Sequence, residues 1–510
     1  MSYKFFLEKI ESITEKIFSK PLILLTLILL SGFLLRIFFT PFDLQSRSSD
    51  AFIFILYALE FQNSLDYIGG TYFMWSGLLA IFFIPFHFDS YDGYFTILEI
   101  VSISISTLSG IVLYLIAKKI ISKKFALLAT AFFVLEPNII ENSILGLTEQ
   151  LFILIGLCSF YFAIQKNTKL LLLSFIFAGL AFDTRPNGII LLIIALSSVY
   201  FQKQSKKEFL KLGSMGILLF LIAISPLLID KLGYVDHVGL LDSETRKNTP
   251  SFELVSGYSD NIYVTAFITD IIHIFRISVP YLILFAPIGF FLSLKRLDLP
   301  IKLIIIAILS SIIVAIPQYT VSVEFRNLFF ITPFLALFSA LGIEYFVENK
   351  KAKNLLIILL IIGLLVTSYN FLREKQPDTN LILEKETFGK FVATSLKGNI
   401  SGEDWIFIQQ NMKWISYGKV DETKNPLYFI VPNFVIHNED ELVKFIKDRH
   451  IDYLIISAEE GNRFKIFPDI YFNEEKYPYM EKIFDSDEHD YKKYRNKIFK
   501  INEEKISLTI

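Results

Sequence analysis

Long apolar stretches separated by short, lysine-rich connections are the feature that most limits how this chain can fold. A stretch of about 18 to 20 apolar residues with few charges is long enough to cross a bilayer as a helix. Hydrophobic residues make up 53% of the 510 residues, and the charged residues lie mostly between the apolar stretches. We therefore predict a polytopic α-helical membrane protein with about eleven spans. The predicted spans are residues 21–39, 94–117, 125–140, 149–164, 170–182, 188–201, 212–229, 278–294, 303–316, 329–347 and 355–371.

Every second connection between these spans carries several Lys or Arg residues. Cytoplasmic loops carry an excess of Lys and Arg, so these connections and the N-terminus are predicted to be cytoplasmic. The C-terminal segment is then extracytoplasmic, and the chain is predicted to be a multi-pass protein of the cell membrane. The basic connections are residues 118–124, 166–169, 203–207, 295–302 and 350–353.

The apolar segment 71–88 would reverse this alternation if it crossed the membrane. We predict that it forms a helix lying in the outer interface. Residues 41–93 then form one long outer loop, and residues 230–277 form a second one. Long loops in compact proteins are usually functional, which makes both loops candidates for a site.

The chain is predicted to divide into two domains. Residues 1–371 form a transmembrane domain that carries the site, and residues 372–510 form a small extracytoplasmic α/β domain. In the second domain, Asn438 followed by Glu441 predicts a capping box that opens a helix through Arg449. The order strand, helix, strand is typical of an α/β fold. The strand-like runs are residues 405–409, 427–431 and 453–457.

Two classes of protein are disfavoured by composition. The chain has one cysteine, so a disulfide framework or a cysteine-based zinc site within one chain is excluded. The net charge is −2, and no tract is basic enough to indicate a nucleic-acid partner.

Ionisable residues gather at the predicted outer ends of the spans, whereas mid-span charges, which mark transport pathways, are nearly absent. This one-sided distribution favours a site that opens on the outer face. Carboxylates can deprotonate an acceptor hydroxyl, and arginine forks pair with phosphate oxygens. Such a mixture suits a sugar carried on a lipid phosphate. The outer-end residues are Asp50, Glu141, Glu149, Asp183, Arg185, Glu324 and Arg326.

Several motifs follow one another in a fixed order on this predicted outer side. They are Asp50 after the first span, the apolar segment 71–88, LEPNIIENSILGLTEQ with Pro137 and Glu149, LAFDTRPNGIILL with Arg185 and Pro186, and EFRNLFFITPFLAL with Arg326 and Pro333. Together they resemble the GT-C glycosyltransferases, especially the branch of protein O-mannosyltransferases and aminoarabinose transferases. The resemblance covers most of the membrane part of the chain.

The resemblance implies an inverting transfer of a hexose-like sugar, of the mannose type, from a polyprenyl or dolichyl phosphate to an exported protein or glycan. Asp50 is then the general base, and Arg185 and Arg326 are candidates for the lipid phosphate. Glu149, Glu324 and Arg276 complete the predicted substrate-binding set. Some relatives bind a divalent metal, for which His237 and His273 are candidate ligands, although their spacing fits no fixed pattern.

Each of these residues also has a structural interpretation. Asp50 can cap a helix, Arg185 can extend to the interface from a span end, and Glu149 can interact with a helix N-terminus. Arg326 can pair locally with Glu324. At the level of the whole protein, the alternatives are a modifier of a membrane glycolipid using the same donors, a transporter or flippase of lipid-linked glycans, and a surface receptor.

Overall fold

The computed structural model describes residues 14–16, 18–42, 49–64, 73–203, 205–225, 262–319, 325–347, 353–376, 378–403, 405–416, 428–430, 432, 434–459, 463–489 and 491–509. Contacts within the chain divide it into two compact units. Unit 1 comprises Met1–Pro41, Ile53–Val238 and Val255–Gln376, and unit 2 comprises Phe42–Phe52, Gly239–Leu254 and Pro377–Ile510.

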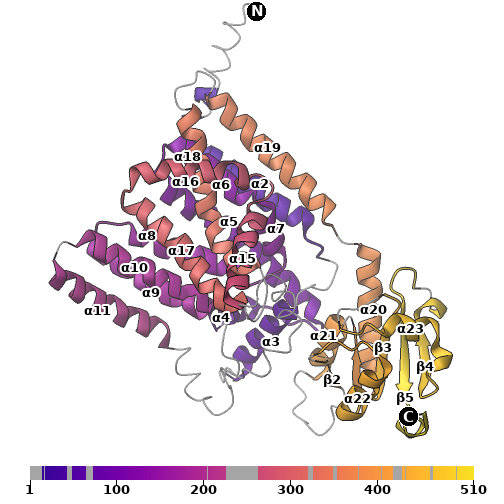
Figure 1. Ribbon diagram of the computed structural model, residues 1–510. Helices are drawn as coiled ribbons and strands as arrows, with labels where there is room; N and C mark the ends of the chain where they lie inside the picture. The colour runs from indigo at the N-terminus through magenta and orange to yellow at the C-terminus, as the bar shows by residue number, and fades with distance from the viewer. Residues whose placement is uncertain are drawn as a thin grey trace, which may run out of the picture. The chain divides into compact units, whose positions relative to one another are not determined.

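Unit 1 is built of helices (Figure 1). The first half contains α2 (Pro21–Phe39), α3 (Ser49–Ser64, whose first residues belong to unit 2), α4 (Phe73–Phe83), α5 (Tyr91–Ala117), α6 (Lys123–Val134), α7 (Pro137–Ile144), α8 (Glu149–Ala163), α9 (Thr168–Thr184), the 3-10 turn η1 (Pro186–Gly188), α10 (Ile189–Gln202) and α11 (Lys206–Ala223). The second half contains α15 (Ile262–Ser278), α16 (Leu282–Ser293), η2 (Leu294–Arg296), α17 (Leu299–Tyr319), η3 (Phe325–Ile331), α18 (Thr332–Val347) and α19 (Lys353–Glu374).

The chain is a multi-pass membrane protein. In the described part of the chain, five helices are long and apolar enough to cross a membrane, and up to seven if each of two bent pairs is one span. The shorter helix α8 (Glu149–Ala163) has 15 residues, or about 22 Å of rise, which is less than the hydrocarbon thickness of about 30 Å. The total of about eleven spans therefore stays a prediction.

Two of the expected elements differ from simple spans. The predicted span 125–140 consists of α6 and α7, which are bent by 49°. Pro137 explains the break, because proline lacks an N–H and disfavours a helical residue before it. Glu136 instead caps α7 by accepting a hydrogen bond from the Asn138 N–H at 3.3 Å. The helix α4 has 11 residues, which is too short to cross a bilayer.

Residues 262–278, at the end of the second expected outer loop, form the apolar helix α15. A bend of 110° separates α15 from the helical segment that follows it. The structure describes residues 262–277 of the loop expected at 230–277, and residues 230–261 lie outside the described part. The polar side chains expected there on a loop are therefore carried, from Ile262 onward, by a helix.

The basic connections of unit 1 meet one another at one end of its helices. Four contacts join five connections that are far apart in the sequence, so all of them lie on the same side. This grouping is what the alternation of lysines predicted for cytoplasmic loops. The contacts are Lys119 Nζ to Gln165 Oε1 at 2.6 Å, Lys124 Nζ to Asn354 Oδ1 at 2.9 Å, Lys203 Nζ to Thr168 Oγ1 at 3.3 Å, and Lys302 Nζ over the Phe201 ring at 5.2 Å.

A buried arginine near the C-terminal end of α2 links four helices by hydrogen bonds. Arg36 is completely buried, and a buried charge in a membrane protein is costly unless its donors are satisfied. Its guanidinium donates to acceptors on α2, on α5, at the end of α6 and on α7. These acceptors are Gly32 O at 2.9 Å, Ser106 Oγ at 3.0 Å, Val134 O at 2.8 Å and Ser143 Oγ at 3.1 Å.

Unit 2 contains a five-stranded mixed sheet in the order β2-β1-β3-β5-β4. Its strands are β1 (Asn399–Gly402), β2 (Tyr428–Phe429), β3 (Tyr453–Ser457), β4 (Met480–Asp485) and β5 (Asn496–Ile501). The strand β1 pairs in parallel with β2 and β3, while β5 is antiparallel to β3 and β4. The helices are α20 (Thr379–Ser395), α21 (Trp405–Ser416), α22 (Glu439–Arg449), α23 (Phe467–Phe472) and α24 (Glu503–Thr509), with the 3-10 turns η5 (Glu474–Lys476) and η6 (Ser486–Glu488).

Both faces of this sheet are covered, because successive side chains of a strand point to opposite faces. On β3, Leu454 and Ile456 pack into a core with residues of α22 and α23. Ile455, between them, packs with Phe388 of α20 and Ile408 of α21. Unit 2 is therefore a three-layer α/β/α arrangement.

The structure confirms part of the secondary structure expected for unit 2. The run 453–457 is β3. Asn438 caps α22 by accepting the Glu441 N–H at 3.0 Å, and Glu441 accepts the N–H of His437, the residue before the cap, at 2.8 Å, which is a variant of the expected capping box. The expected strand at 405–409 is wrong, because this segment begins α21. Ile408 and Met412, four residues apart on one helical face, are buried in the same core, whereas Phe407 packs with Ile382 of α20. A short apolar run does not reveal this helical spacing.

Glu384 of α20 makes unit 2 sensitive to acid. The backbone N–H groups of Lys492, Lys493 and Tyr494 donate to its carboxylate at 3.1, 2.9 and 2.8 Å. Burial acts to raise the pKa of Glu384, but these three donors outweigh it, so the pKa lies below its ordinary value of 4.5. The ionised Glu384 carboxylate therefore stabilises the folded state above the ordinary pKa. This stabilisation is lost as the pH falls through the lower pKa that Glu384 has in the folded protein.

We expect Glu384→Gln to lower the thermal unfolding midpoint of the full chain at pH 7, and the difference from wild type to shrink below about pH 4. Glu475→Gln, at an exposed position of η5, is the matched control and should leave the midpoint unchanged. Thermal unfolding in detergent at several pH values measures both. A difference that persists undiminished at pH 3 would contradict the assignment.

Candidate functional site

A buried carboxylate at the start of α8 joins two arginines from different parts of unit 1. Glu149 is the first residue of α8, and its side chain is 2% exposed. Its Oε1 accepts a hydrogen bond from Nη1 of Arg185 and lies 3.6 Å from Nε of Arg326. One carboxylate is thus shared by two guanidinium groups, which leaves an excess of positive charge among these three side chains.

Arg185 is oriented by the proline that follows it. Pro186 disfavours a helical conformation at Arg185, whose backbone is extended with φ −153° and ψ 140°, so α9 ends there. The side chain then reaches the first turn of α8. Besides Glu149, its Nη1 donates to Thr148 Oγ1 at 3.2 Å and its Nη2 donates to Asn327 Oδ1 at 2.8 Å.

The 3-10 segment η3 carries the third part of the site. Arg326 and Asn327 of η3 face Glu149 and Arg185, and the preceding residue, Phe325, faces α15. The Arg276 guanidinium lies 4.5 Å from the centre of the Phe325 ring, a cation–π distance. The His273 ring lies edge-on to the same ring at 6.2 Å. Helices α8, α9 and α15 therefore all contribute side chains around η3.

Several carboxylate oxygens near these elements are buried without a hydrogen-bond partner among the described residues. Both oxygens of Asp270, on α15 three residues before His273, are in this state, and the residue is 0% exposed. One oxygen each of Glu149 and Asp183 is in the same state. An unsatisfied buried polar group is costly, and in native proteins such groups often mark functional sites.

Comparison with known proteins links this geometry to a family. Residues 79–229 match the family model described as dolichyl-phosphate-mannose-protein mannosyltransferase. This stretch includes Glu149 and Arg185. No curated protein sequence matches the chain.

Two solved structures share its fold. ArnT from Cupriavidus metallidurans, bound to undecaprenyl phosphate, has a TM-score of 0.58 at 9% identity, covering 94% of this chain and 97% of ArnT. The oligosaccharyltransferase AglB from Archaeoglobus fulgidus, in complex with an inhibitory peptide and a dolichol-phosphate, has a TM-score of 0.57 at 11% identity, covering 86% of this chain and 69% of AglB. Both are GT-C glycosyltransferases. The chain therefore shares the fold of these GT-C proteins, and residues 79–229 carry the family match.

The structure brings together three of the residues predicted from the sequence, namely Glu149, Arg185 and Arg326. Arg276 and His273 lie on α15 and contact the ring of Phe325. Phe325 directly precedes Arg326 in η3. Asp50 lies in the first turn of α3 and belongs to unit 2. Glu324 and His237 lie outside the described residues.

The described residues do not supply a metal site. Within them, no group of three or more His, Cys, Asp or Glu side chains is arranged to hold an ion. His273 instead packs against an aromatic ring. We therefore derive no chemical step through a metal.

Three residues of the site were not predicted as site residues. Thr148 and Asn327 are neutral neighbours of Glu149 and Arg326 in the sequence, and only their contacts with Arg185 give them a role. Asp270 stood among the polar residues of its segment, but no local pattern indicated that it would be buried. The one signal in the sequence for Thr148 and Asn327 was that each lies beside a predicted site residue.

Replacing Glu149 tests how strongly the site depends on it. We expect Glu149→Gln to destabilise the protein by about 3 kcal/mol, because it leaves two partly buried arginines without their shared carboxylate. Glu141→Gln is the matched control, since Glu141 forms an exposed ion pair with Lys375 at 2.6 Å with both side chains at least 40% exposed. Its loss should cost less than about 1 kcal/mol. Denaturant unfolding in detergent compares the two variants, and equal losses would contradict a special role for Glu149.

Proposed function

We propose that this protein transfers a hexose-like sugar, of the mannose type, from a polyprenyl or dolichyl phosphate to an exported protein or glycan. The observation that carries the proposal is the pairing of Arg185 and Arg326 around one carboxylate, which places two guanidinium groups, the side chains best suited to phosphate, at one site. The lipid phosphates bound by the similarly folded ArnT and AglB support a donor of the same chemical class.

The two arginines have different tasks in this proposal. Arg185 has hydrogen bonds to three protein acceptors, and its side chain is 12% exposed, so it positions the site. Arg326 is more accessible, with a side chain that is 24% exposed, and it approaches Glu149 through Nε at 3.6 Å. Arg326 therefore contacts the donor phosphate, and Glu149 and Arg185 hold η3 in the position from which it does so.

The reaction is a single displacement at the anomeric carbon. Asp50, the base that the family resemblance implies, takes the proton of the acceptor hydroxyl. The acceptor oxygen attacks the anomeric carbon from the face opposite the phosphate, and the bond from that carbon to the phosphate oxygen breaks. The lipid phosphate leaves with the electron pair, stabilised by Arg326. The products are a glycoside of inverted configuration and the free polyprenyl phosphate.

The same arrangement supports a site on the outer side of the cell membrane. Helices α8 and α9 form an antiparallel pair, with Lys166 and Lys169 at their connection and Glu149 and Arg185 at their opposite ends. If the basic end faces the cytoplasm, the Glu149 end faces outward. The N-terminus is then cytoplasmic and unit 2 is extracytoplasmic. Nucleotide sugars are normally absent from that compartment, which is the physical reason for a lipid-linked donor.

Arg326→Ala tests the donor assignment. A charge-assisted hydrogen bond to phosphate contributes about 1.5 to 3 kcal/mol, so we expect kcat/KM for the donor to fall roughly 10- to 100-fold. The thermal unfolding midpoint should change less than in Glu149→Gln. Arg326→Lys restores the charge but not the fork, and should recover only part of the loss. Transfer kinetics with radiolabelled polyprenyl-phosphate hexoses measure this, and an unchanged kcat/KM in Arg326→Ala contradicts the assignment.

Asp50→Asn tests the reaction and the base together. In a strain lacking the gene, mass spectrometry of surface glycoproteins and lipid-linked glycans should show one hexose missing, and the wild-type gene should restore it. Loss of a general base costs about 10²- to 10⁴-fold in rate, so Asp50→Asn should fail to restore the hexose.

Asp270→Asn is the comparison variant, because Asp270 is the other carboxylate that its position makes a candidate base. It should retain most of the transfer rate. If Asp50→Asn restores the hexose fully while Asp270→Asn does not, the base is Asp270 and the role of Asp50 is wrong. If deletion leaves every glycan unchanged, the transferase proposal itself fails in that cell.

A further inference from the structure

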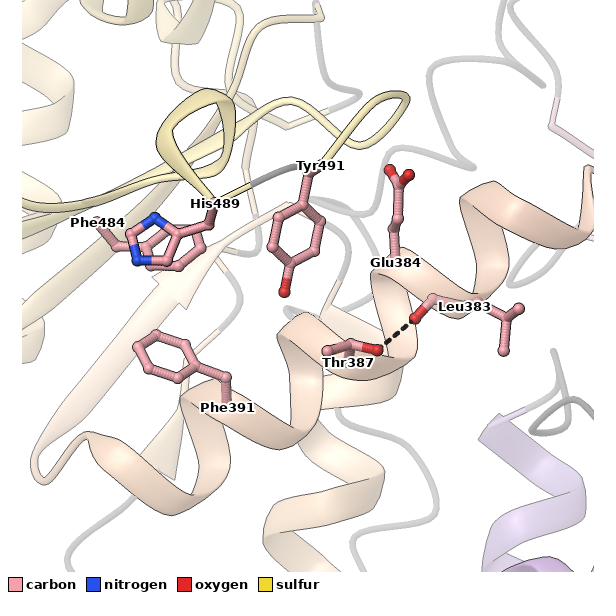
Figure 2. Close-up of a pocket in the computed structure, with 7 residues that line it drawn as sticks. All are labelled: Leu383, Glu384, Thr387, Phe391, Phe484, His489 and Tyr491. Carbon is pink, nitrogen blue, oxygen red and sulfur yellow. Dashed lines mark hydrogen bonds between the residues drawn. The ribbon is translucent and has the colours of Figure 1, made fainter.

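Unit 2 contains a pocket that is separate from the Glu149 group, which lies in unit 1. The pocket encloses about 430 Å³ between α20 and the segment from the end of β4 to the residues before β5. Figure 2 shows side chains of α20 on one wall and aromatic side chains of the facing segment on the other. The lining residues are Leu383, Glu384, Thr387, Phe391, Phe484, His489 and Tyr491.

The walls of this pocket are fixed by contacts outside it. Glu384 accepts three backbone N–H groups from residues 492–494, and Asp378 at the start of α20 pairs with Lys493. Beneath the pocket, the buried ring of Phe388 packs against Phe484 at 5.5 Å. The pocket is therefore preformed, and a ligand would not have to order it.

Four of the seven residues that line the pocket carry aromatic rings. The His489 ring lies 4.4 Å from Phe484 in a tilted stack, and the Phe391 ring lies 5.1 Å from Phe484 on the α20 side. The side chain of Phe391 is 37% exposed although it is a large apolar residue of a folded domain. Figure 2 shows the Tyr491 ring beside these rings, with its hydroxyl directed toward α20 between Phe391 and Thr387.

A few polar groups accompany the rings. Nδ1 of His489 is engaged with the Asp485 carbonyl at 3.1 Å, while Nε2 has no hydrogen bond among the described residues. The Tyr491 hydroxyl also lacks a hydrogen bond to any described residue. Burial and the Glu384 charge raise the pKa of Tyr491, which keeps its hydroxyl protonated and able to donate. Glu384 adds a fixed carboxylate at the rim, which can accept hydrogen bonds.

We propose that this pocket binds a pyranose ring of a neutral glycan. A pyranose has an apolar C–H face and a rim of hydroxyls, and the C–H face packs on the electron-rich face of an aromatic ring. The pocket offers both parts of that pattern, with Phe391, Tyr491 and His489 for the face and the Tyr491, His489 and Glu384 polar atoms for the rim. Its volume lies in the range of small-molecule sites.

Other ligand classes fit the lining less well. An anionic sugar or a phosphate would meet the Glu384 carboxylate, and the lining contains no Lys or Arg side chain to balance that charge. An acyl chain would leave the Tyr491 hydroxyl and the His489 Nε2 without partners, which is unfavourable. The proposal does not rest on the donor site, because its evidence comes from unit 2 alone.

The test uses the full chain in detergent micelles and a panel of methyl glycosides of neutral hexoses, including mannose, glucose and galactose. Saturation-transfer NMR should show contact with the C–H protons of at least one glycoside. We expect Phe391→Ala to weaken binding of that glycoside about five- to tenfold, the loss of one aromatic contact. Tyr491→Phe, which keeps the ring and removes the hydroxyl, should weaken it by a smaller factor.

Phe472→Ala is the matched control, because Phe472 is an exposed aromatic residue of unit 2, 62% exposed, outside the pocket lining. It should leave binding unchanged, and so should Arg326→Ala, which alters only the donor site. Binding of no neutral glycoside, or equal losses in Phe391→Ala and Phe472→Ala, overturns the proposal. If Phe391→Ala reduced only saturation transfer to detergent or lipid chains, and no glycoside bound, the pocket would be an apolar contact surface and the proposal would be overturned.

Discussion

The shared carboxylate of Glu149 is the interaction on which the candidate site of unit 1 depends. It lies at the first residue of α8 and contacts an arginine that ends α9 and another that belongs to η3. Buried charges are costly when unpaired, so each of these elements stabilises the position of the other two. Among these three side chains, two guanidinium groups face one carboxylate, and this is the charge that the proposed lipid-phosphate donor would meet.

Unit 1 has two chemically different ends, and its helices run between them. Basic connections contact one another at one end, where Lys119, Lys124, Lys203 and Lys302 meet residues of neighbouring connections. The Glu149 group lies at the other end of α8 and α9. The lysines that predict the topology and the charged residues of the candidate site therefore lie at opposite ends of the same helices. Arg36 adds a buried link between α2, α5, α6 and α7 that needs no carboxylate, because serine hydroxyls and backbone carbonyls accept its donors.

Unit 2 presents a different kind of surface. Its mixed sheet is covered on both faces, yet one edge of the α20 layer leaves an aromatic pocket open. With the proposed protein or glycan acceptors, a pocket of the kind inferred for unit 2 would raise the local concentration of glycosylated acceptors. Binding of that kind adds affinity without contacting the reacting atoms.

The sequence by itself determined the features that depend on neighbouring residues. The apolar stretches, the alternating lysines, the Asn438 capping box, the strand at 453–457 and the Arg185-Pro186 turn follow from local hydrophobicity, local hydrogen bonds and proline geometry. It also identified Glu149, Arg185 and Arg326 as candidates, since charges at span ends are conspicuous. It misassigned residues 405–409, because a short apolar run fits a strand or a buried helix equally well.

Only the tertiary structure decided which of these charges share a site. Arg185 meets Asn327 across 142 residues of sequence, and Glu149 becomes the common partner of two arginines only when η3 lies against α8. Burial of Asp270 and the aromatic pocket of unit 2 arise in the same way, from packing between distant segments. The physical reason is range: propensities and caps act over a few residues, whereas ion pairs and pockets depend on helices that the folded chain brings together.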